Sequence, residues 1–346
     1  MELDSKSGLD SFSRPRISVC IANYNGDGVI RRCIESVKNQ TLTESIEIIV
    51  HDDASTDKSA SQIKEYSDAI LLESDRNVGY CESNNRMVAI AKGEYLLLLN
   101  NDATLYPDAL SVLEGYARLY PNDILTLPQY SFSSGELLDT GMRVDMFCNP
   151  VPTTDSRTTH RAMAMGACLW IPRHVWDTCG GFPPWFESMA EDMYICFFAR
   201  LCGYAVQCVP QSGYTHVVGH SFGGGKVIGS GLSSTYRRRA LSERNKTFVM
   251  LLTYPVSVLV LVLPLHIISL IFECAVLCVA KRSWKPLEKI YLNIVKGVVT
   301  NWKNLCIARS TFLRVRRWTC LDVLSVTNLV PYKLSMLLKY GLPKLK

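Results

Sequence analysis

The sequence predicts an α/β fold, in which helices flank a mostly parallel, Rossmann-like sheet and a helical, membrane-associated region follows at the C-terminal end. Apolar segments of strand length alternate with helical patterns over residues 17–100, which is typical of βαβ units. Residues 95–99 are apolar without alternation, as in a strand buried on both faces. Polar residues follow the strands at one edge, where open α/β sheets bind their ligands.

The expected elements follow one another at short intervals. In the first hundred residues, strands are predicted over residues 17–22, 46–50, 69–72 and 95–99. Helices separate these strands, the first with Ile30, Ile34 and Val37 on one face and the third over residues 79–92. Residues 124–160 are poorly patterned. After them we expect a strand over 165–172, a helix over 191–202 and a strand over 205–209.

Charge divides the chain into unequal parts. Residues 1–246 contain 23 Lys and Arg against 29 Asp and Glu, a net charge of −6, whereas residues 281–346 contain 14 against 2, a net charge of +12. Between them, residues 247–280 carry one charged side chain, Glu273. We therefore expect four parts: a flexible N-terminus (1–16), a catalytic domain (17–246), an apolar membrane-associated segment (247–280) and a basic amphipathic helical tail (281–346).

The thirteen cysteines indicate a reducing compartment rather than a disulfide framework. The first sixteen residues are polar and lack the apolar core of a signal peptide, which favours a cytosolic setting. No Cys-x-x-Cys pair occurs, and this disfavours a structural zinc site. The cysteines are better interpreted as small core residues.

Polar clusters end three of the predicted strands. They are Asn23-Tyr24-Asn25, Asp52-Asp53 and Asn100-Asn101-Asp102. The first strand is not followed by Gly-x-Gly-x-x-Gly, so a nicotinamide-type site is disfavoured and a nucleotide site built from carboxylates is favoured. Asp52 would accept hydrogen bonds from a base or ribose, and Asp102 would hold a divalent cation on a diphosphate. The alternative is that these residues only turn the chain and cap helices.

Two further signals lie downstream. Glu191 and Asp192 open a helix, where acidic residues favour the helix dipole, but two close carboxylates can also raise each other's pKa and supply a general base. His216 precedes a glycine-rich stretch, residues 219–231, that contains Lys226 and could close over a phosphate. The histidine is either structural or a metal ligand.

Over residues 17–250 these motifs together resemble family 2 glycosyltransferases of the GT-A fold, in particular the rhamnosyltransferase-like enzymes of bacterial surface-polysaccharide assembly. The resemblance rests on blocks whose order and spacing agree with the family: Ser18 to Gly26, Asp52 to Asp57, Asn77-Val78-Gly79, Leu99 to Asp102, Gly180-Gly181-Phe182, Glu191-Asp192, Gly203-Tyr204, and His216 to Ser221.

This resemblance implies inverting sugar transfer from a nucleotide-diphosphate sugar, assisted by Mn²⁺ or Mg²⁺. Asp52 would bind the base, Asp102 would bind the metal, His216 could complete the metal shell, and Asp192 would deprotonate the acceptor. Asn23, Tyr24, Asn25, Asp53, Asn77, Asn100 and Asn101 are further expected donor contacts, and Glu191 is expected beside the base. The chain departs from the family pattern at Asn100, Pro184, Tyr194 and Phe198, which bears on sugar and acceptor identity.

Residues 247–280 are too few for two membrane spans and a turn. A single span would place the basic tail outside the cytosol, against the positive-inside tendency, so we expect a re-entrant or in-plane helical hairpin. A buried core or dimerisation helix is the alternative. Basic residues interleave with Trp284 and Trp302 in the tail, as in helices that bind anionic lipid, whereas no nucleic-acid motif is present. Arg237 and Arg244 could meet an acceptor diphosphate or lipid headgroups.

The sequence therefore predicts a peripheral or monotopic glycosyltransferase on the cytoplasmic face of the plasma membrane, acting on a lipid-linked or polysaccharide acceptor, with a second copy of the chain as a candidate partner. A non-catalytic sugar- or lipid-binding scaffold that kept the fold is the alternative, motivated by the substitutions at Asn100, Pro184 and Tyr194.

Overall fold

The computed structural model describes residues 14–155, 157, 159–217, 226–228, 231–317 and 319–346. A seven-stranded sheet forms its centre, in the order β12-β6-β11-β4-β1-β2-β3. The strands are β1 (Ile17–Asn23), β2 (Ile46–Asp52), β3 (Ala69–Glu73), β4 (Tyr95–Asn100), β6 (Ile124–Thr126), β11 (Cys168–Pro172) and β12 (Val206–Cys208). All neighbouring pairs are parallel except those of β11, which runs antiparallel to β4 and β6. The predicted mostly parallel sheet is confirmed.

Helices cover both faces of this sheet. They are α1 (Ile30–Lys38), α2 (Ser59–Ile63), α3 (Tyr80–Ile90), α4 (Ala109–Leu119), α5 (Arg173–Cys179) and α6 (Glu191–Leu201). The predicted face of α1 is buried, because Ile30, Ile34 and Val37 pack with Cys33 into the core. Strand β4 is buried along its apolar length from Tyr95 to Leu99, and this fixes the position of the polar residues that follow it.

Three small sheets complete the strand arrangement. One contains β5 (Ala103–Leu105), β13 (Tyr214–His216), β7 (Gln129–Ser131) and β8 (Leu137–Asp139). A second contains β10 (Pro150–Pro152), β9 (Met142–Asp145) and β16 (Thr327–Asn328). The third contains β14 (Lys226–Ile228), β15 (Gly231–Ser234) and β17 (Lys344–Leu345). The pairing of β13 with β5 brings His216 opposite Ala103, next to the end of β4.

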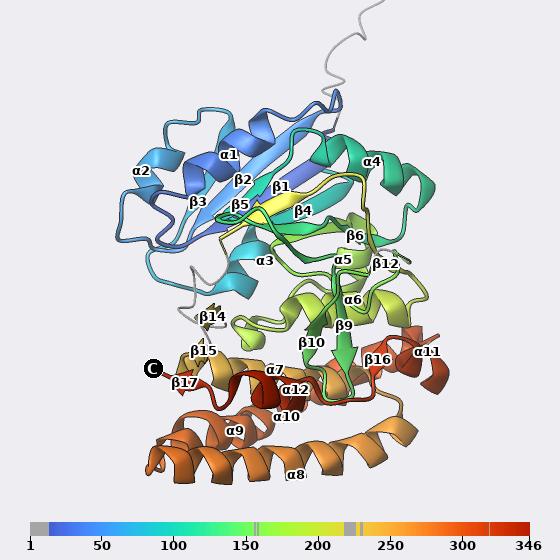
Figure 1. The fold of residues 1–346 in the computed structure, drawn as a ribbon. Helices are drawn as coiled ribbons and strands as arrows, with labels where there is room; N and C mark the ends of the chain where they lie inside the picture. The colour runs from blue at the N-terminus through green and yellow to red at the C-terminus, as the bar shows by residue number, and fades with distance from the viewer. Residues whose placement is uncertain (1–13, 156, 158, 218–225, 229–230, 318) are drawn as a thin grey trace, which may run out of the picture.

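The C-terminal helices form a platform on the side of the molecule away from α1 and α4 (Figure 1). They are α7 (Tyr236–Thr253), α8 (Val256–Lys281), η2 (Leu287–Tyr291), α9 (Leu292–Thr300), α10 (Trp302–Val315), α11 (Cys320–Ser325) and α12 (Tyr332–Tyr340). Helix α7 packs against α6, α9 and α10, and its C-terminal half is buried. Helix α8 runs along the outer edge of the platform (Figure 1).

The predicted hairpin within residues 247–280 is wrong. Residues 247–253 are the buried end of α7, the chain turns at Tyr254 and Pro255, and α8 then continues for 26 residues. Pro264 lies inside α8 without ending it. In the part of the chain that the structure describes, α8 is the one helix long and apolar enough to cross a membrane.

One face of α8 packs on the molecule and the other is exposed. The inward face consists of Val262, His266, Leu270 and Leu277. The outward face includes Val260, Leu261, Ile268, Ile271 and Phe272, each between 62% and 70% exposed. A continuous apolar surface of this kind marks an interaction site rather than ordinary solvent-facing surface.

Candidate functional site

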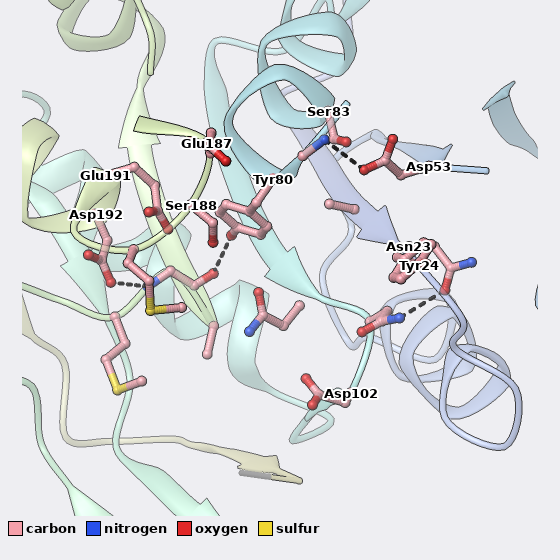
Figure 2. A pocket seen from close by; sticks show the side chains of 18 of the residues that line it. Asn23, Tyr24, Asp53, Tyr80, Ser83, Asp102, Glu187, Ser188, Glu191 and Asp192 are labelled. Atoms are coloured by element: carbon pink, nitrogen blue, oxygen red, sulfur yellow. Dashed lines mark hydrogen bonds between the residues drawn. The ribbon is translucent and has the colours of Figure 1, made fainter. Parts of the chain in front are cut away.

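A cavity of about 320 Å³ opens at the carboxyl ends of β1 and β4. It lies between the end of the sheet, the N-termini of α3 and α6 and the start of α7, so residues far apart in the chain meet there. Its polar lining contains Asn23, Tyr24, Asp53, Asn77, Tyr80, Asn100, Asn101, Asp102, Glu187, Glu191, Asp192, His216, Arg237 and Arg238. Figure 2 places Tyr24 and Asp53 on one side and Glu191 and Asp192 on the other, with Asp102 between them.

A buried amide pair supports the floor of this cavity. Asn101 Nδ2 donates to Asn23 Oδ1 at 2.8 Å, while Asn23 Nδ2 donates to Asp52 Oδ1 at 2.7 Å and to Ser59 Oγ at 2.9 Å (Figure 2). Gly26 lies directly over the pair, because a Cβ there would be 2.2 Å from Asn23 Oδ1. The two asparagines are thus fixed by their contacts, and their positions are set before any ligand binds.

Asp52 does not reach the cavity, which corrects its predicted contact with a base. Its carboxylate accepts hydrogen bonds from other protein groups: from the Asn23 side chain, and from the backbone amide and hydroxyl of Ser55 at 3.0 and 2.6 Å. Asn25 is likewise engaged, since its Oδ1 accepts from the Thr56 amide at 2.8 Å. Both residues shape the loops beside the cavity rather than line it.

Asp53 lines the cavity instead, although it is as buried as Asp52. It accepts from the Val78 and Gly79 amides at 2.6 and 2.9 Å, which joins the end of β2 to the start of α3. Successive residues of a strand point to opposite sides, so one of two adjacent aspartates faces the ligand. Tyr24, which is 46% exposed, and Asn77 stand beside Asp53 as predicted donor contacts.

Asp102 and His216, the two predicted cation ligands, lie side by side in the cavity. The side chains are 2% and 7% exposed, and His216 Nε2 lies 3.0 Å from Asp102 Oδ1. Apart from this approach of His216, Asp102 Oδ1 has no hydrogen-bond partner among the described residues. The two atoms lie at the separation of about 3 Å expected between adjacent ligands of an octahedral ion with bonds of about 2.1 Å.

These two side chains fit a divalent ion that takes its remaining ligands from elsewhere. Asn100 Nδ2 approaches His216 Nε2 at 3.5 Å and orients the ring. No cluster of three or more His, Cys, Asp or Glu occurs among the described residues. Mg²⁺ is commonly held in this way, by one or two protein groups together with substrate phosphates and water.

The carboxylate pair at the start of α6 differs from ordinary surface acids. Burial and the neighbouring charge of Asp192 raise the pKa of Glu191, and burial also raises the pKa of Asp192. Asp192 accepts from the amides of Gly166 and Met193 at 3.1 and 2.7 Å, whereas Glu191 Oε2 has no partner among the described residues. Amide donors stabilise the charged form, so these contacts of Asp192 oppose the effect of burial on its pKa.

The loop before this pair is strained and tied to α7. Glu187, Met189 and Ala190 all have positive φ, between 63° and 74°, which non-glycine residues adopt at a cost. Asn245, fully buried, donates through Nδ2 to the carbonyls of Phe186, Ser188 and Met189 at 2.8 to 2.9 Å. Helix α7 therefore fixes the loop that carries the carboxylates.

Arg244 belongs to the same support, which corrects its predicted contact with an acceptor. Its guanidinium donates to the carbonyls of Trp185 and Phe186 and to Glu187 Oε1 at 3.0 to 3.2 Å. Arg237, 70% exposed at its side chain, does line the cavity. Lys226 begins β14, but its side chain and most of the predicted glycine-rich loop (218–225 and 229–230) lie outside the described residues.

Tyr80 and Glu187 are lining residues that the sequence prediction missed. Tyr80 donates through its hydroxyl to Gly166 O at 3.0 Å beside Asp192, and burial raises its pKa (Figure 2). Tyr80 follows the Asn77-Val78-Gly79 motif directly, so its position was the available signal. Glu187 carried no motif, and only the fold brings it to the cavity. Arg238 belongs to the run of three arginines, 237–239, that the sequence marked for an acceptor diphosphate or lipid headgroups.

Comparison with known proteins finds a family match in the N-terminal half of the chain. Residues 18–179 match the family described as Glycosyl transferase family 2. The uncharacterized glycosyltransferase MJ1057 of Methanocaldococcus jannaschii is 35% identical over 107 residues, 30% of this chain and 37% of that protein. The poly(ribitol-phosphate) beta-glucosyltransferase of Bacillus spizizenii is 32% identical over 146 residues, 40% of this chain and 22% of that protein. The aligned parts are thus well under half of either relative.

A solved structure agrees with this match. The crystal structure of GalNAc-T7 with UDP, GalNAc and Mn²⁺ superposes with a TM-score of 0.56 at 17% identity, covering 70% of this chain and 48% of that chain. At this identity the likeness shows the fold alone. The acid pair and His216 lie beyond the matched family residues, so their assignment depends on the geometry of the cavity. Residues 18–179, a little under half of the chain, thus match glycosyltransferase family 2, and the α/β fold that contains them is GT-A-like.

Proposed function

We propose that the protein transfers a hexose or deoxyhexose from a nucleotide-diphosphate donor to an acceptor hydroxyl, with inversion at the sugar. One observation carries the proposal: a single cavity has Asp53 on one side, Asp192 on the opposite side and Asp102 between them, with His216 Nε2 3.0 Å from Asp102 Oδ1. A donor bound across this cavity would present its diphosphate to Asp102 and the far face of its sugar to the acid pair. In-line displacement needs that arrangement.

Each group then has a defined task. Asp53 and Tyr24 lie where a base and ribose would bind, and Asp102 with His216 would hold the cation. When bound, the cation neutralises the charge that develops on the departing diphosphate. Asp192 takes the proton of the attacking hydroxyl, and Tyr80 keeps the adjoining Gly166 carbonyl in place, so that the Gly166 amide stays directed at Asp192.

A thermal-shift screen tests the donor half of this proposal. Nucleoside diphosphates and nucleotide sugars would be added with and without Mn²⁺, and the matching base should stabilise the fold by about 2.7 kcal/mol at a hundredfold excess over its Kd. Asp53→Asn should lose most of that stabilisation, whereas Asp75→Asn, an exposed aspartate nearby, should keep it. If no nucleotide shifts the transition, the donor site is disproved, and binding without turnover would favour the scaffold alternative.

We also propose that α8 and the basic residues after it attach the protein to the cytoplasmic surface of a membrane. The outward face of α8 is apolar and Trp284 and Trp302 are 71% and 58% exposed, which suits the boundary between headgroups and acyl chains. Segment 281–346, with its net charge of +12, suits anionic lipid.

Flotation with vesicles measures this attachment. The protein should float with vesicles containing 30% anionic lipid and float less with neutral vesicles. Replacing Ile268 and Ile271 by Ser should reduce the floated fraction, whereas replacing the inward-facing Val262 by Ala should not. Equal flotation of the double variant would contradict the role of this face.

A further inference from the structure

A second cavity adjoins the first. It has a volume of about 530 Å³ and lies between α7, α8 and α12, on the platform side of the molecule (Figure 1). Arg238, in the first turn of α7, lines both cavities and marks their junction. A molecule that passes Arg238 would therefore have one part near the acid pair and the other part inside the platform.

The walls of the second cavity are mainly apolar. They include Phe147, Leu232, Leu270, Phe272, Val276, Leu277, Leu334, Met336, Leu337 and Leu342. Most of its charged groups form ion pairs: Lys333 Nζ lies 2.7 Å from Glu243 and 2.8 Å from Glu273, and Lys246 Nζ lies 3.1 Å from Glu243. An apolar cavity of this size is typical of a site for a small molecule or an alkyl chain.

Arg238 is the exception among the cations of α7 near the junction. Arg237 and Arg244 pair with Glu187, and Arg239 pairs with Glu273. For Arg238, no carboxylate within the described residues lies at ion-pair distance. Its guanidinium is partly buried, and this burial lowers its pKa, as expected for a cation that lacks a compensating charge. A guanidinium in such a position suits a phosphate or diphosphate.

The second cavity also adjoins the exposed surface of α8. Phe272, on its rim, is 68% exposed and continues the outward apolar face of that helix. An apolar chain could thus reach the cavity from lipid without crossing water. The order from membrane to catalytic carboxylates is then apolar cavity, Arg238, and the polar cavity with the acid pair.

We infer that the acceptor is a sugar joined through a diphosphate to a long apolar chain, with the chain in the second cavity and the diphosphate at Arg238. The inference rests on the proposed transfer reaction and narrows its acceptor to one chemical class. Helix α12 would then form one wall of the binding site for the apolar chain. Ion pairs of Lys333 with Glu243 and Glu273 hold this helix against α7 and α8.

Binding of three probes to the full chain tests the inference. Farnesyl diphosphate, farnesol and inorganic diphosphate would be titrated in EDTA, which removes the cation needed for diphosphate binding at Asp102. Farnesyl diphosphate should bind at least about tenfold more tightly than either other probe, because only it engages both the arginine and the apolar cavity. Equal binding of farnesol, or of inorganic diphosphate, would overturn the inference.

Variants separate the two halves of the site. Arg238→Gln should reduce the affinity for farnesyl diphosphate about tenfold and leave that for farnesol unchanged. Leu337→Trp, which fills the cavity, should weaken both farnesyl probes, whereas Leu338→Trp on the same helix, 80% exposed and outside the cavity, should weaken neither. Unchanged binding in Leu337→Trp would place the chain elsewhere and overturn the inference.

Donor binding serves as the independent readout. UDP and the other nucleotides, measured with Mn²⁺ on Leu337→Trp, should bind as to the wild type, since Leu337 lines the second cavity and not the first. Failure of nucleotide binding in the wild type would remove the proposed function. Failure of the farnesyl titrations alone would remove only the acceptor class.

Discussion

Asp192→Asn should abolish sugar transfer while leaving donor binding intact. An amide cannot accept the proton of the attacking hydroxyl, and loss of a general base costs about 100-fold to 10,000-fold in rate. The measurement is transfer of radiolabelled sugar at saturating donor, together with nucleotide affinity from calorimetry. Transfer at the wild-type rate would remove Asp192 from the mechanism.

Glu191→Gln is the matched control for this change. We expect Glu191 to carry the proton that the pair shares, because burial and Asp192 raise its pKa and its Oε2 has no hydrogen-bond partner among the described residues. A glutamine imitates that neutral state, so this variant should retain much of the transfer rate. Loss of transfer in Glu191→Gln together with full activity in Asp192→Asn would show that the two roles are reversed.

The same pair predicts how stability depends on pH. In the native state both carboxyls have a raised pKa, so between the ordinary carboxyl pKa of about 4 and the raised values the native state binds more protons than the unfolded state. Stability contributed by these groups therefore falls as pH rises through that range. Asp192→Asn removes one titrating group and should make this fall shallower in urea unfolding curves. The rate of sugar transfer by the wild type should instead rise with pH over this range, because the base must lose its own proton before it can accept one.

Much of the fold could be predicted because its strongest sequence signals are local. The unbroken apolar run of β4 and the spaced apolar residues of α1 required no knowledge of the partners that they contact. Strand direction is not encoded in this way. An apolar run reads the same in both directions, so the antiparallel β11 between two neighbours was not evident.

The site shows a similar division. Strand ends identified Asn23, Asp53 and Asp102, and a helix start identified Asp192. The sequence prediction gave the base contact to Asp52, whereas Asp53 lines the cavity, because hydrogen bonds from Asn23 and Ser55 hold the Asp52 carboxylate inside the protein. The role of Asn245 arises from three carbonyls of a loop more than fifty residues away.

Asp102→Ala should remove the dependence of donor binding on Mn²⁺ or Mg²⁺ and reduce transfer by a factor comparable to that of Asp192→Asn. Asp102 Oδ1 is buried without a partner among the described residues, an arrangement that costs free energy unless a ligand compensates for it. The cost predicts a second effect: the variant should unfold at the same temperature or higher when no cation is present. If Asp102 served only to stabilise the fold, Asp102→Ala would instead lower the unfolding temperature.

His216→Ala distinguishes a cation site from a general electrostatic effect. The imidazole lies 3.0 Å from Asp102 Oδ1 and supplies no net charge when neutral, so its loss should weaken cation affinity without changing metal-free nucleotide binding. Asn101→Ala, which breaks the buried amide pair but leaves both ligands, should weaken nucleotide binding with and without metal. Calorimetry should therefore show that Asp102→Ala and His216→Ala weaken nucleotide binding only when metal is present. Asn101→Ala should weaken it both with and without metal. Equal losses in all three would mean that the cavity holds the donor through shape and hydrogen bonds alone, and that Asp102 is not a metal ligand.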